Sequence, residues 1–136
     1  MRLSVIKSKR STSDMQFLYT ARELESKTRH KCLTAPKRYT FYGLQELWLT
    51  ARHIYSNVKQ GNSIYPTSQH EAQMRRDLFI MAGCMLQDYV SQLELLTQDD
   101  VLPVDAHEEL SALVDSEIKL LKAVIKSDKS RYENLP

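Results

Sequence analysis

Apolar side chains recur every three or four residues along most of this chain, and this spacing constrains the fold more than any other feature of the sequence. Four segments show it: residues 13–35, residues 37–60, a third that opens at Ser68 and a fourth that begins at Asp105. The spacing places the apolar side chains on one face of an α-helix, and each face needs a neighbour that buries it. With 3 Gly and 4 Pro among 136 residues, the chain has few turn-forming residues for a many-stranded sheet. The sequence therefore predicts an all-α protein that forms an antiparallel up-down four-helix bundle.

The predicted core consists of these four apolar stripes. Their members are Phe17, Ala21, Leu24, Thr28 and Cys32; Leu44, Leu47, Trp48, Ala51, Ile54, Tyr55 and Val58; Leu78, Ala82, Met85, Leu86, Tyr89, Leu93 and Leu96; and Leu110, Leu113, Val114, Ile118, Leu121, Val124 and Ile125. We also expect Met74, Met81 and Cys84 in the core, because Met adapts to irregular gaps and free Cys is among the most buried residue types.

Capping signals mark the expected starts of three helices. Ser13 with Gln16, and Ser68 with Glu71, have the spacing of a capping box, in which two polar side chains satisfy otherwise unpaired backbone donors. Asp105 is the expected N-cap of the fourth helix.

The end of the second helix and the surface of the third also carry local signals. Gly61 is expected to stop the second helix, because Gly suits the left-handed position that closes a helix, and Pro66 prevents the helix from resuming. Glu71 and Arg75 lie four residues apart with the acid first, which predicts an ion pair on the exposed face of the third helix.

The length of the chain fits one domain with two short flanking segments. Residues 13–131 form the predicted bundle, residues 1–12 a basic, disordered N-terminal arm, and residues 132–136 a C-terminal tail. No run approaches the roughly 18 to 20 apolar residues that cross a bilayer, and residues 1–10 lack the apolar stretch of a secretory leader. The two cysteines form no CxxC pair, which indicates a reducing compartment. We therefore expect a cytoplasmic protein without membrane contact.

The net charge of +2 conceals two halves of opposite sign. Residues 1–60 hold 12 Lys and Arg against 4 Asp and Glu, a balance of +8, whereas residues 61–136 hold 7 against 13, a balance of −6. Such a division favours contact with an anionic partner on one side, or attraction between opposite faces of two subunits. The alternative is ordinary solvated helix surface.

No linear motif for metal binding or catalysis is present in the sequence. No Glu is followed three residues later by His, as a di-iron bundle requires, and His30, His53, His70 and His107 are widely separated. Neither cysteine has a nucleophile signature, and no glycine-rich phosphate loop or GxSxG occurs. We therefore expect a protein that is not an enzyme and uses no metal, cofactor or small-molecule substrate. A catalytic site assembled from distant residues would leave no linear pattern, so an enzyme is kept as a further hypothesis.

Basic residues repeat at seven-residue spacing on the first two helices. Arg38, Arg52 and Lys59 share one register with Gln45 in the gap, and Arg22 and Arg29 repeat the spacing on the first helix. Together with Lys27, Lys31 and Lys37 they would form a cationic face that follows phosphates. Solvated surface charge is the alternative. Tyr39, Phe41 and Tyr42 lie beside Lys37 and Arg38 and could stack on single-stranded bases, although we expect Phe41 in the core.

Several stretches resemble the Avd-like four-helix-bundle family. They are Ala35-Pro36-Lys37-Arg38-Tyr39, Asn62-Ser63-Ile64-Tyr65-Pro66, His70-Glu71-Ala72 and Arg75-Arg76-Asp77, followed by Ala82-Gly83 with Leu86 and by the segment from Ile118 to Lys126. The resemblance covers residues 13–131. Members of this family are accessory variability determinants of diversity-generating retroelements and are related to proteins encoded in intervening sequences of bacterial 23S ribosomal RNA.

The resemblance implies a non-catalytic, barrel-shaped homopentamer that associates with a retroelement reverse transcriptase and with its RNA or cDNA. Such an assembly supports mutagenic reverse transcription. By matching motifs, the binding role falls on Lys37, Arg38, Arg75 and Arg76, whose change to glutamate is expected to leave helicity intact, and then on Arg52 and Lys59. The alternative is a structural, RNA-associated bundle of the intervening-sequence kind with no polymerase partner.

Overall fold

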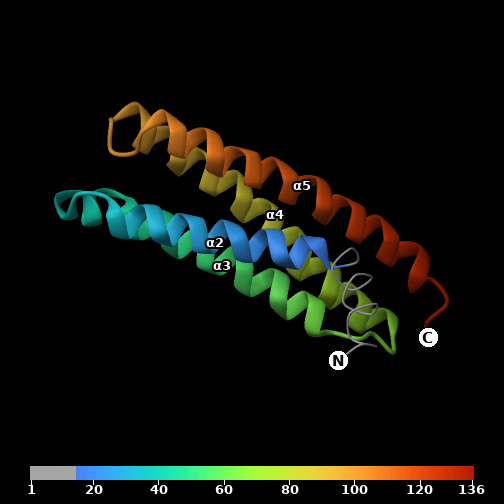
Figure 1. The fold of residues 1–136 in the computed structure, drawn as a ribbon. Helices are drawn as coiled ribbons and strands as arrows, with labels where there is room; N and C mark the ends of the chain where they lie inside the picture. Colours follow the sequence, from blue (N-terminus) through green and yellow to red (C-terminus); the bar gives the residue numbers. More distant parts are fainter. Residues whose placement is uncertain (1–14) are drawn as a thin grey trace, which may run out of the picture.

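The computed structural model describes residues 15–136, which are almost entirely helical and contain no strand (Figure 1). The elements are α2 (Gln16–Thr34), the 3₁₀ helix η1 (Lys37–Tyr42), α3 (Leu44–Ser63), α4 (Gln69–Gln98) and α5 (Val104–Arg131). The all-α prediction is confirmed. The predicted basic arm of residues 1–12 and the capping position Ser13 lie outside the described residues.

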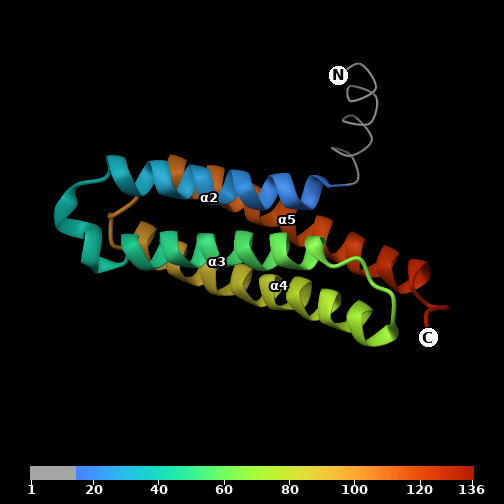
Figure 2. The same ribbon diagram turned by 90° about the horizontal axis from the view of Figure 1, so that it is seen from below.

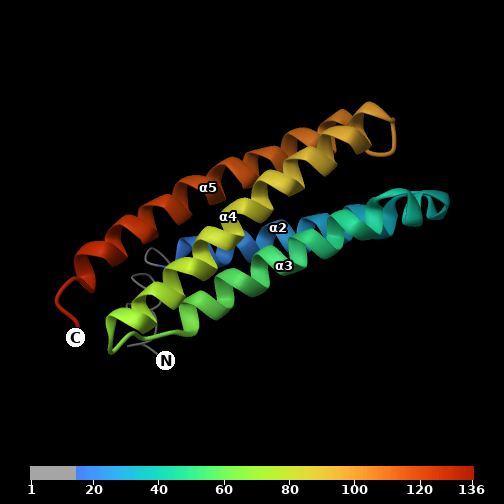
Figure 3. The same ribbon diagram turned by 180° about the vertical axis from the view of Figure 1, so that it is seen from behind.

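The four long helices lie side by side in two layers. In Figures 1 and 3, α2 and α3 form one layer, and α4 and α5 form the other. Helix α3 packs against α2 and α4, and α5 packs against the same two helices. Figure 2 shows η1 at one end of the molecule and the connection between α3 and α4 at the other. The apolar faces of all four helices meet between the layers.

Most of the predicted stripe positions are buried there. Leu24, Ile54, Leu86 and Val114 are fully buried, one on each long helix. Met74 and Met81 are instead about half exposed, and Cys84 is exposed on α4, so the prediction that these residues belong to the core is wrong. An apolar residue type was therefore not enough to predict that a side chain of α4 is buried.

The start of α4 confirms the capping role of Ser68 but not the ion pair predicted for Glu71. Ser68 is the N-cap, and its Oγ accepts a hydrogen bond from the Glu71 backbone N–H at 3.2 Å. The Glu71 carboxylate accepts from Thr67, through both its backbone N–H (2.7 Å) and its hydroxyl (2.6 Å), so the expected Glu71–Arg75 ion pair does not form. These hydrogen bonds from Thr67 lower the pKa of Glu71.

The N-cap of the fourth long helix lies two residues earlier than expected. Pro103 occupies the N-cap position of α5, so Asp105 lies within the first helical turn and caps nothing. The Asp105 carboxylate is still stabilised by the positive end of the helix dipole. The predicted C-terminal tail, residues 132–136, contacts the start of α4. The Gln69 backbone N–H donates to the carbonyl oxygen of Pro136 at 2.8 Å, and the Gln69 side chain donates to that of Tyr132 at 2.7 Å.

The second predicted helix differs most from expectation. Residues 37–42 form the 3₁₀ helix η1, and Gly43 separates it from α3 with a φ of +125°, a conformation that favours glycine. At its other end α3 continues through Gly61 to Ser63. Gly61 does not stop the helix. A Cβ atom at this position would lie 2.7 Å from a ring carbon of Phe79, so Gly61 allows α3 and α4 to approach closely.

No helix within residues 15–136 combines the length and apolar character needed to span a bilayer.

Candidate nucleic-acid interface

The 3₁₀ helix η1 presents two basic side chains to solvent. Pro36 ends the extended segment after α2, and Lys37 and Arg38 follow it in exposed positions. The Arg38 guanidinium lies over the Tyr39 ring, 4.7 Å from its centroid, and donates to the Tyr39 hydroxyl at 3.1 Å. Within the described chain, neither Lys37 nor Arg38 makes an ion pair. Both charges are therefore available to an anionic partner.

The aromatic residues of η1 are also exposed. Phe41 is 91% exposed, so the expectation that it packs in the core is wrong. The short 3₁₀ helix has no buried residue of its own and carries the ring outward. Tyr42 is held differently, because its hydroxyl donates to Oδ2 of Asp99 at 2.9 Å, and this hydrogen bond raises the pKa of Tyr42. Phe41 is thus an exposed aromatic ring beside two cations.

Four further basic residues are exposed on the α2–α3 layer. They are Arg22 and Arg29 on α2, and Arg52 and Lys59 on α3. Arg29 lies close to the contact between α2 and α3. Oε2 of Glu25, on α2, accepts a hydrogen bond from Trp48 Nε1 of α3 at 2.9 Å and forms an ion pair with Arg29 at 3.3 Å. Each basic pair keeps its seven-residue spacing and hence one side of its helix.

Lys27 and Lys31 contribute less positive charge to this face than predicted. Both pair with Glu109 of α5, at 3.2 and 2.9 Å. The hydrogen bonds from Lys31 and then from Lys27 lower the pKa of Glu109. One carboxylate thus partly neutralises two lysines that were expected to meet phosphates.

The structure corrects the predicted exposure of Arg75, because its side chain is buried. The residue is 5% exposed, and its Nε donates to Oδ2 of Asp128 at 2.7 Å. Its Nη1 donates to the carbonyl oxygens of Gly61 and Ile64, each at 3.2 Å, and its guanidinium lies 4.9 Å from the Phe79 ring centroid. Arg75 therefore holds α3, α4 and α5 together, and its change to glutamate would disrupt the fold.

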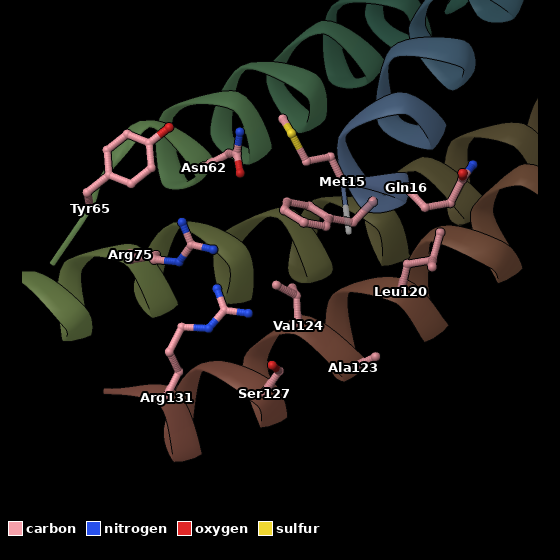
Figure 4. A pocket seen from close by; sticks show the side chains of 11 residues that line it. Met15, Gln16, Asn62, Tyr65, Arg75, Leu120, Ala123, Val124, Ser127 and Arg131 are labelled. Atoms are coloured by element: carbon pink, nitrogen blue, oxygen red, sulfur yellow. The ribbon is translucent and has the colours of Figure 1, made fainter. Parts of the chain in front are cut away.

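One side of Arg75 borders a cavity. Figure 4 shows its guanidinium and that of Arg131 directed into a cavity of about 380 Å³, with Asn62 and Tyr65 on the α3 side and Val124 on α5. The Arg75 guanidinium uses Nε and Nη1 for its carboxylate and two carbonyl partners.

The structure also separates residues that the resemblance grouped. Arg75 contacts Gly61 and Ile64 at the end of α3, whereas Lys37 and Arg38 precede the start of that helix. Helix α3 has 20 residues and is about 30 Å long. The structure therefore does not bring together the four residues to which the resemblance assigns the binding role: Lys37 and Arg38 lie at one end of α3, and Arg75 lies at the other. Arg76 is half-buried on α4 and donates to Gln73 Oε1 at 2.7 Å.

The expected continuous register of Arg38 with Arg52 and Lys59 is interrupted as well. The left-handed backbone at Gly43 ends η1 before α3 begins, so Arg38 does not share a helix with the other two residues. The candidate interface consists of two adjoining parts: the exposed side chains of η1, and the basic residues Arg22, Arg29, Arg52 and Lys59 of the α2–α3 layer.

A cavity next to η1 escaped the sequence-based reasoning. It has a volume of about 330 Å³ and is lined by Leu33 of α2, Thr40 and Phe41 of η1, and Gln45 and Trp48 of α3, with Cys32 and Leu44 at its base. The one available signal was Leu33, an apolar residue outside the predicted stripe and close to the predicted end of the first helix before Pro36. Trp48 was assigned to the core and is half-buried at this cavity.

The described part of the chain shows no arrangement of side chains for metal binding or for nucleophilic attack. Residues 15–136 contain no cluster of three or more His, Cys, Asp or Glu residues placed to hold a metal ion. Burial raises the pKa of Cys32 to about 11, so its thiol is protonated at neutral pH, and its Sγ donates to the carbonyl oxygen of Leu44 at 3.3 Å. A protonated thiol is a weak nucleophile.

Comparison of the chain with protein-family models, curated proteins and solved structures finds no match.

Proposed function

We propose that this protein is a non-catalytic accessory protein that binds a retroelement reverse transcriptase and its RNA or cDNA in the cytoplasm. The polymerase partner follows from the resemblance to the Avd-like family, and the observation that supports nucleic-acid binding is the exposed basic and aromatic surface of η1 and the α2–α3 layer. Lys37, Arg38 and Phe41 lie together at one end, and Arg22, Arg29, Arg52 and Lys59 extend along the layer. Cations along a rod suit a phosphate backbone, and an exposed ring suits unpaired bases.

We also infer that the four long helices form an antiparallel up-down bundle. The contacts between α3 and α4 support this direction, because Thr50 accepts from Gln92 at 2.9 Å whereas Asn57, further along α3, contacts Met85, earlier on α4. The resemblance to the Avd-like family adds a homopentamer to the proposal. Several copies would multiply a basic surface that is modest in a single chain.

Co-purification tests the proposal directly. The full chain is expected to retain a reverse transcriptase encoded near its own gene and to bind single-stranded RNA at low salt, with affinity falling steeply as salt rises. Scattering or ultracentrifugation is expected to give about five times the mass of one chain. A protein that binds neither polymerase nor RNA would contradict the proposal.

The same experiments distinguish the proposed accessory protein from the alternative function. RNA binding without any polymerase partner would favour the structural, RNA-associated bundle. A variant with Lys37, Arg38, Arg52 and Lys59 changed to glutamate keeps Arg75 intact, so it is expected to lose association while circular dichroism and melting temperature stay close to those of the unchanged protein. Unchanged association in this variant would exclude the surface identified above.

A further inference from the structure

We infer that the cavity between Leu33, Phe41 and Trp48 binds one unstacked nucleobase of a single-stranded nucleic acid. This inference rests on the proposed nucleic-acid binding and names the site and the form of the ligand. A cavity of about 330 Å³ lies at the small end of the range for ligand sites, which suits one base and excludes a larger folded ligand.

The walls of the cavity match the two kinds of surface that a base presents. Phe41 offers a ring face that is almost wholly exposed, and Leu33, 67% exposed, adds an apolar surface across the cavity. Bases held outside a helical stack are typically packed between aromatic and apolar side chains. The Thr40 hydroxyl and Gln45 amide lie on the same cavity and provide donors and acceptors for a base edge.

Charge around the cavity distinguishes a nucleic acid from an apolar peptide. Residues 27–45 contain Lys27, Arg29, Lys31, Lys37 and Arg38 and no Asp or Glu. The ion partners of the first three come from Glu25 and Glu109, whereas Lys37 and Arg38 have none within the described chain. The cores of protein interfaces are depleted in lysine, while cations next to a stacking ring are the usual arrangement for single strands. Lys37, exposed on the same short 3₁₀ helix as Phe41, would hold a phosphate that flanks the bound base. Arg38 lines a separate pocket with Tyr42 and Asp99, so it would contact the strand further from the base.

The geometry favours a single strand over a duplex. The bases of a duplex are stacked on one another, so a ring on a short 3₁₀ helix has no base face to contact. A single strand exposes its bases and pays little to place one of them in the cavity.

Trp48 provides a built-in measurement, because it is the only tryptophan in the chain and it lines the cavity. Titration of the full chain with an oligouridylate of about 10 nucleotides is expected to change the Trp48 emission as the base enters. The matching duplex is expected to bind without that change. An unchanged Trp48 emission on binding of the single strand would overturn the inference.

Phe41→Ala tests the stacking contact without threatening the core. Loss of the ring is expected to weaken oligouridylate binding at least fivefold (about 1 kcal/mol), and Phe41→Trp is expected to retain it. Tyr65→Ala is the matched control, because Tyr65 is also exposed but follows α3 at the other end of the molecule. Equal loss in both variants, or none in Phe41→Ala, would contradict the site.

The outcomes separate this inference from the proposed function. If RNA and polymerase both bind normally to Phe41→Ala, the base site is wrong and the accessory role stands. If Phe41→Ala loses the polymerase and keeps oligouridylate binding, the cavity is a protein-docking site and the inference fails. If the unchanged protein binds the polymerase but no nucleic acid, the inference fails and the polymerase-binding role stands.

Discussion

Glu117 places a carboxyl group in the apolar core. Its side chain is fully buried on the inner face of α5, one turn from both Val114 and Leu121, and neither of its oxygens has a hydrogen-bond partner among the described residues. Burial without a partner disfavours the charged form and raises the pKa of Glu117 to about 9. The folded protein therefore keeps this group protonated at neutral pH, while the unfolded chain ionises it near 4.5.

The raised pKa makes stability depend on pH. Between pH 4.5 and about 9 the folded state binds one more proton than the unfolded state at this residue, so its contribution to stability falls as pH rises and is constant outside that window. Glu117→Gln removes the titration. The variant is expected to match the unchanged protein at pH 4 and to gain about 1.4 kcal/mol relative to it for each pH unit above pH 4.5.

Urea denaturation at several pH values measures this difference, with the exposed Glu108→Gln on the same helix as the control. A constant difference between Glu117→Gln and the unchanged protein from pH 4.5 to 8 would show that Glu117 ionises normally in the folded protein.

Arg75 and Asp128 give the second prediction at this scale. Their side chains are 6% and 1% exposed, so Arg75→Met would leave a buried carboxylate without its partner. That variant is expected to lose about 3 to 5 kcal/mol, and the double variant Arg75→Met, Asp128→Leu should recover most of it. Arg76→Met is the adjacent control and should change stability by less than about 0.5 kcal/mol. If Arg75→Met loses no more stability than Arg76→Met, leaving the Asp128 carboxylate without its partner does not have the expected cost.

Two glycines within the helices, Gly61 in α3 and Gly83 in α4, have different surroundings. A Cβ at Gly61 would meet the Phe79 ring at 2.7 Å, whereas a Cβ at Gly83, within α4, would meet nothing within 4 Å. Gly61→Ala is therefore expected to cost about 1 to 3 kcal/mol through overpacking. Gly83→Ala should gain roughly 0.5 to 1 kcal/mol, because alanine favours a helix. Thermal denaturation of both variants measures the contrast, and the same sign of change in both would contradict the close approach of α3 and α4.

The helices were predictable because each apolar stripe depends on side chains of its own segment, but their ends and partners were not. Gly61 fits a helix stop as well as it fits a close contact, and only the position of Phe79 on α4 distinguishes the two. Arg75 has the sequence context of surface charge, because its partner Asp128 lies 53 residues away. Local spacing carries no information about such a pair.

The candidate site was predictable in part for the same reason. Lys37, Arg38 and Phe41 are neighbours in the sequence, so their grouping followed directly from it. The cavity beside them combines Leu33, Phe41 and Trp48, which come from three elements and meet only because η1 turns the chain between α2 and α3. The sequence predicts one helix over residues 37–60, because apolar spacing gives no signal for the left-handed backbone at Gly43 that separates η1 from α3.

The whole molecule divides its charge between its two layers. Residues 16–63, which form α2, η1 and α3, hold 8 Lys and Arg against 3 Asp and Glu, whereas residues 69–131, which form α4 and α5, hold 7 against 12. The layers lie on opposite sides of the molecule (Figure 1), so an extended polyanion is attracted to one side and repelled by the other. Binding through the α2–α3 layer therefore predicts which lysines and arginines set the salt dependence.

Arg52→Gln with Lys59→Gln removes two exposed charges from the α2–α3 layer. If each contacts one phosphate of a single strand, the slope of log K against log salt should become shallower by about 1.4, because each such contact contributes about 0.7. Lys122→Gln with Lys126→Gln removes two exposed charges from α5 and should leave the slope unchanged. Fluorescence anisotropy of a labelled oligouridylate over a salt series measures both slopes. Equal reductions in the two double variants would mean that the strand responds to net charge alone, since only contact along one layer makes the position of the lost charges matter.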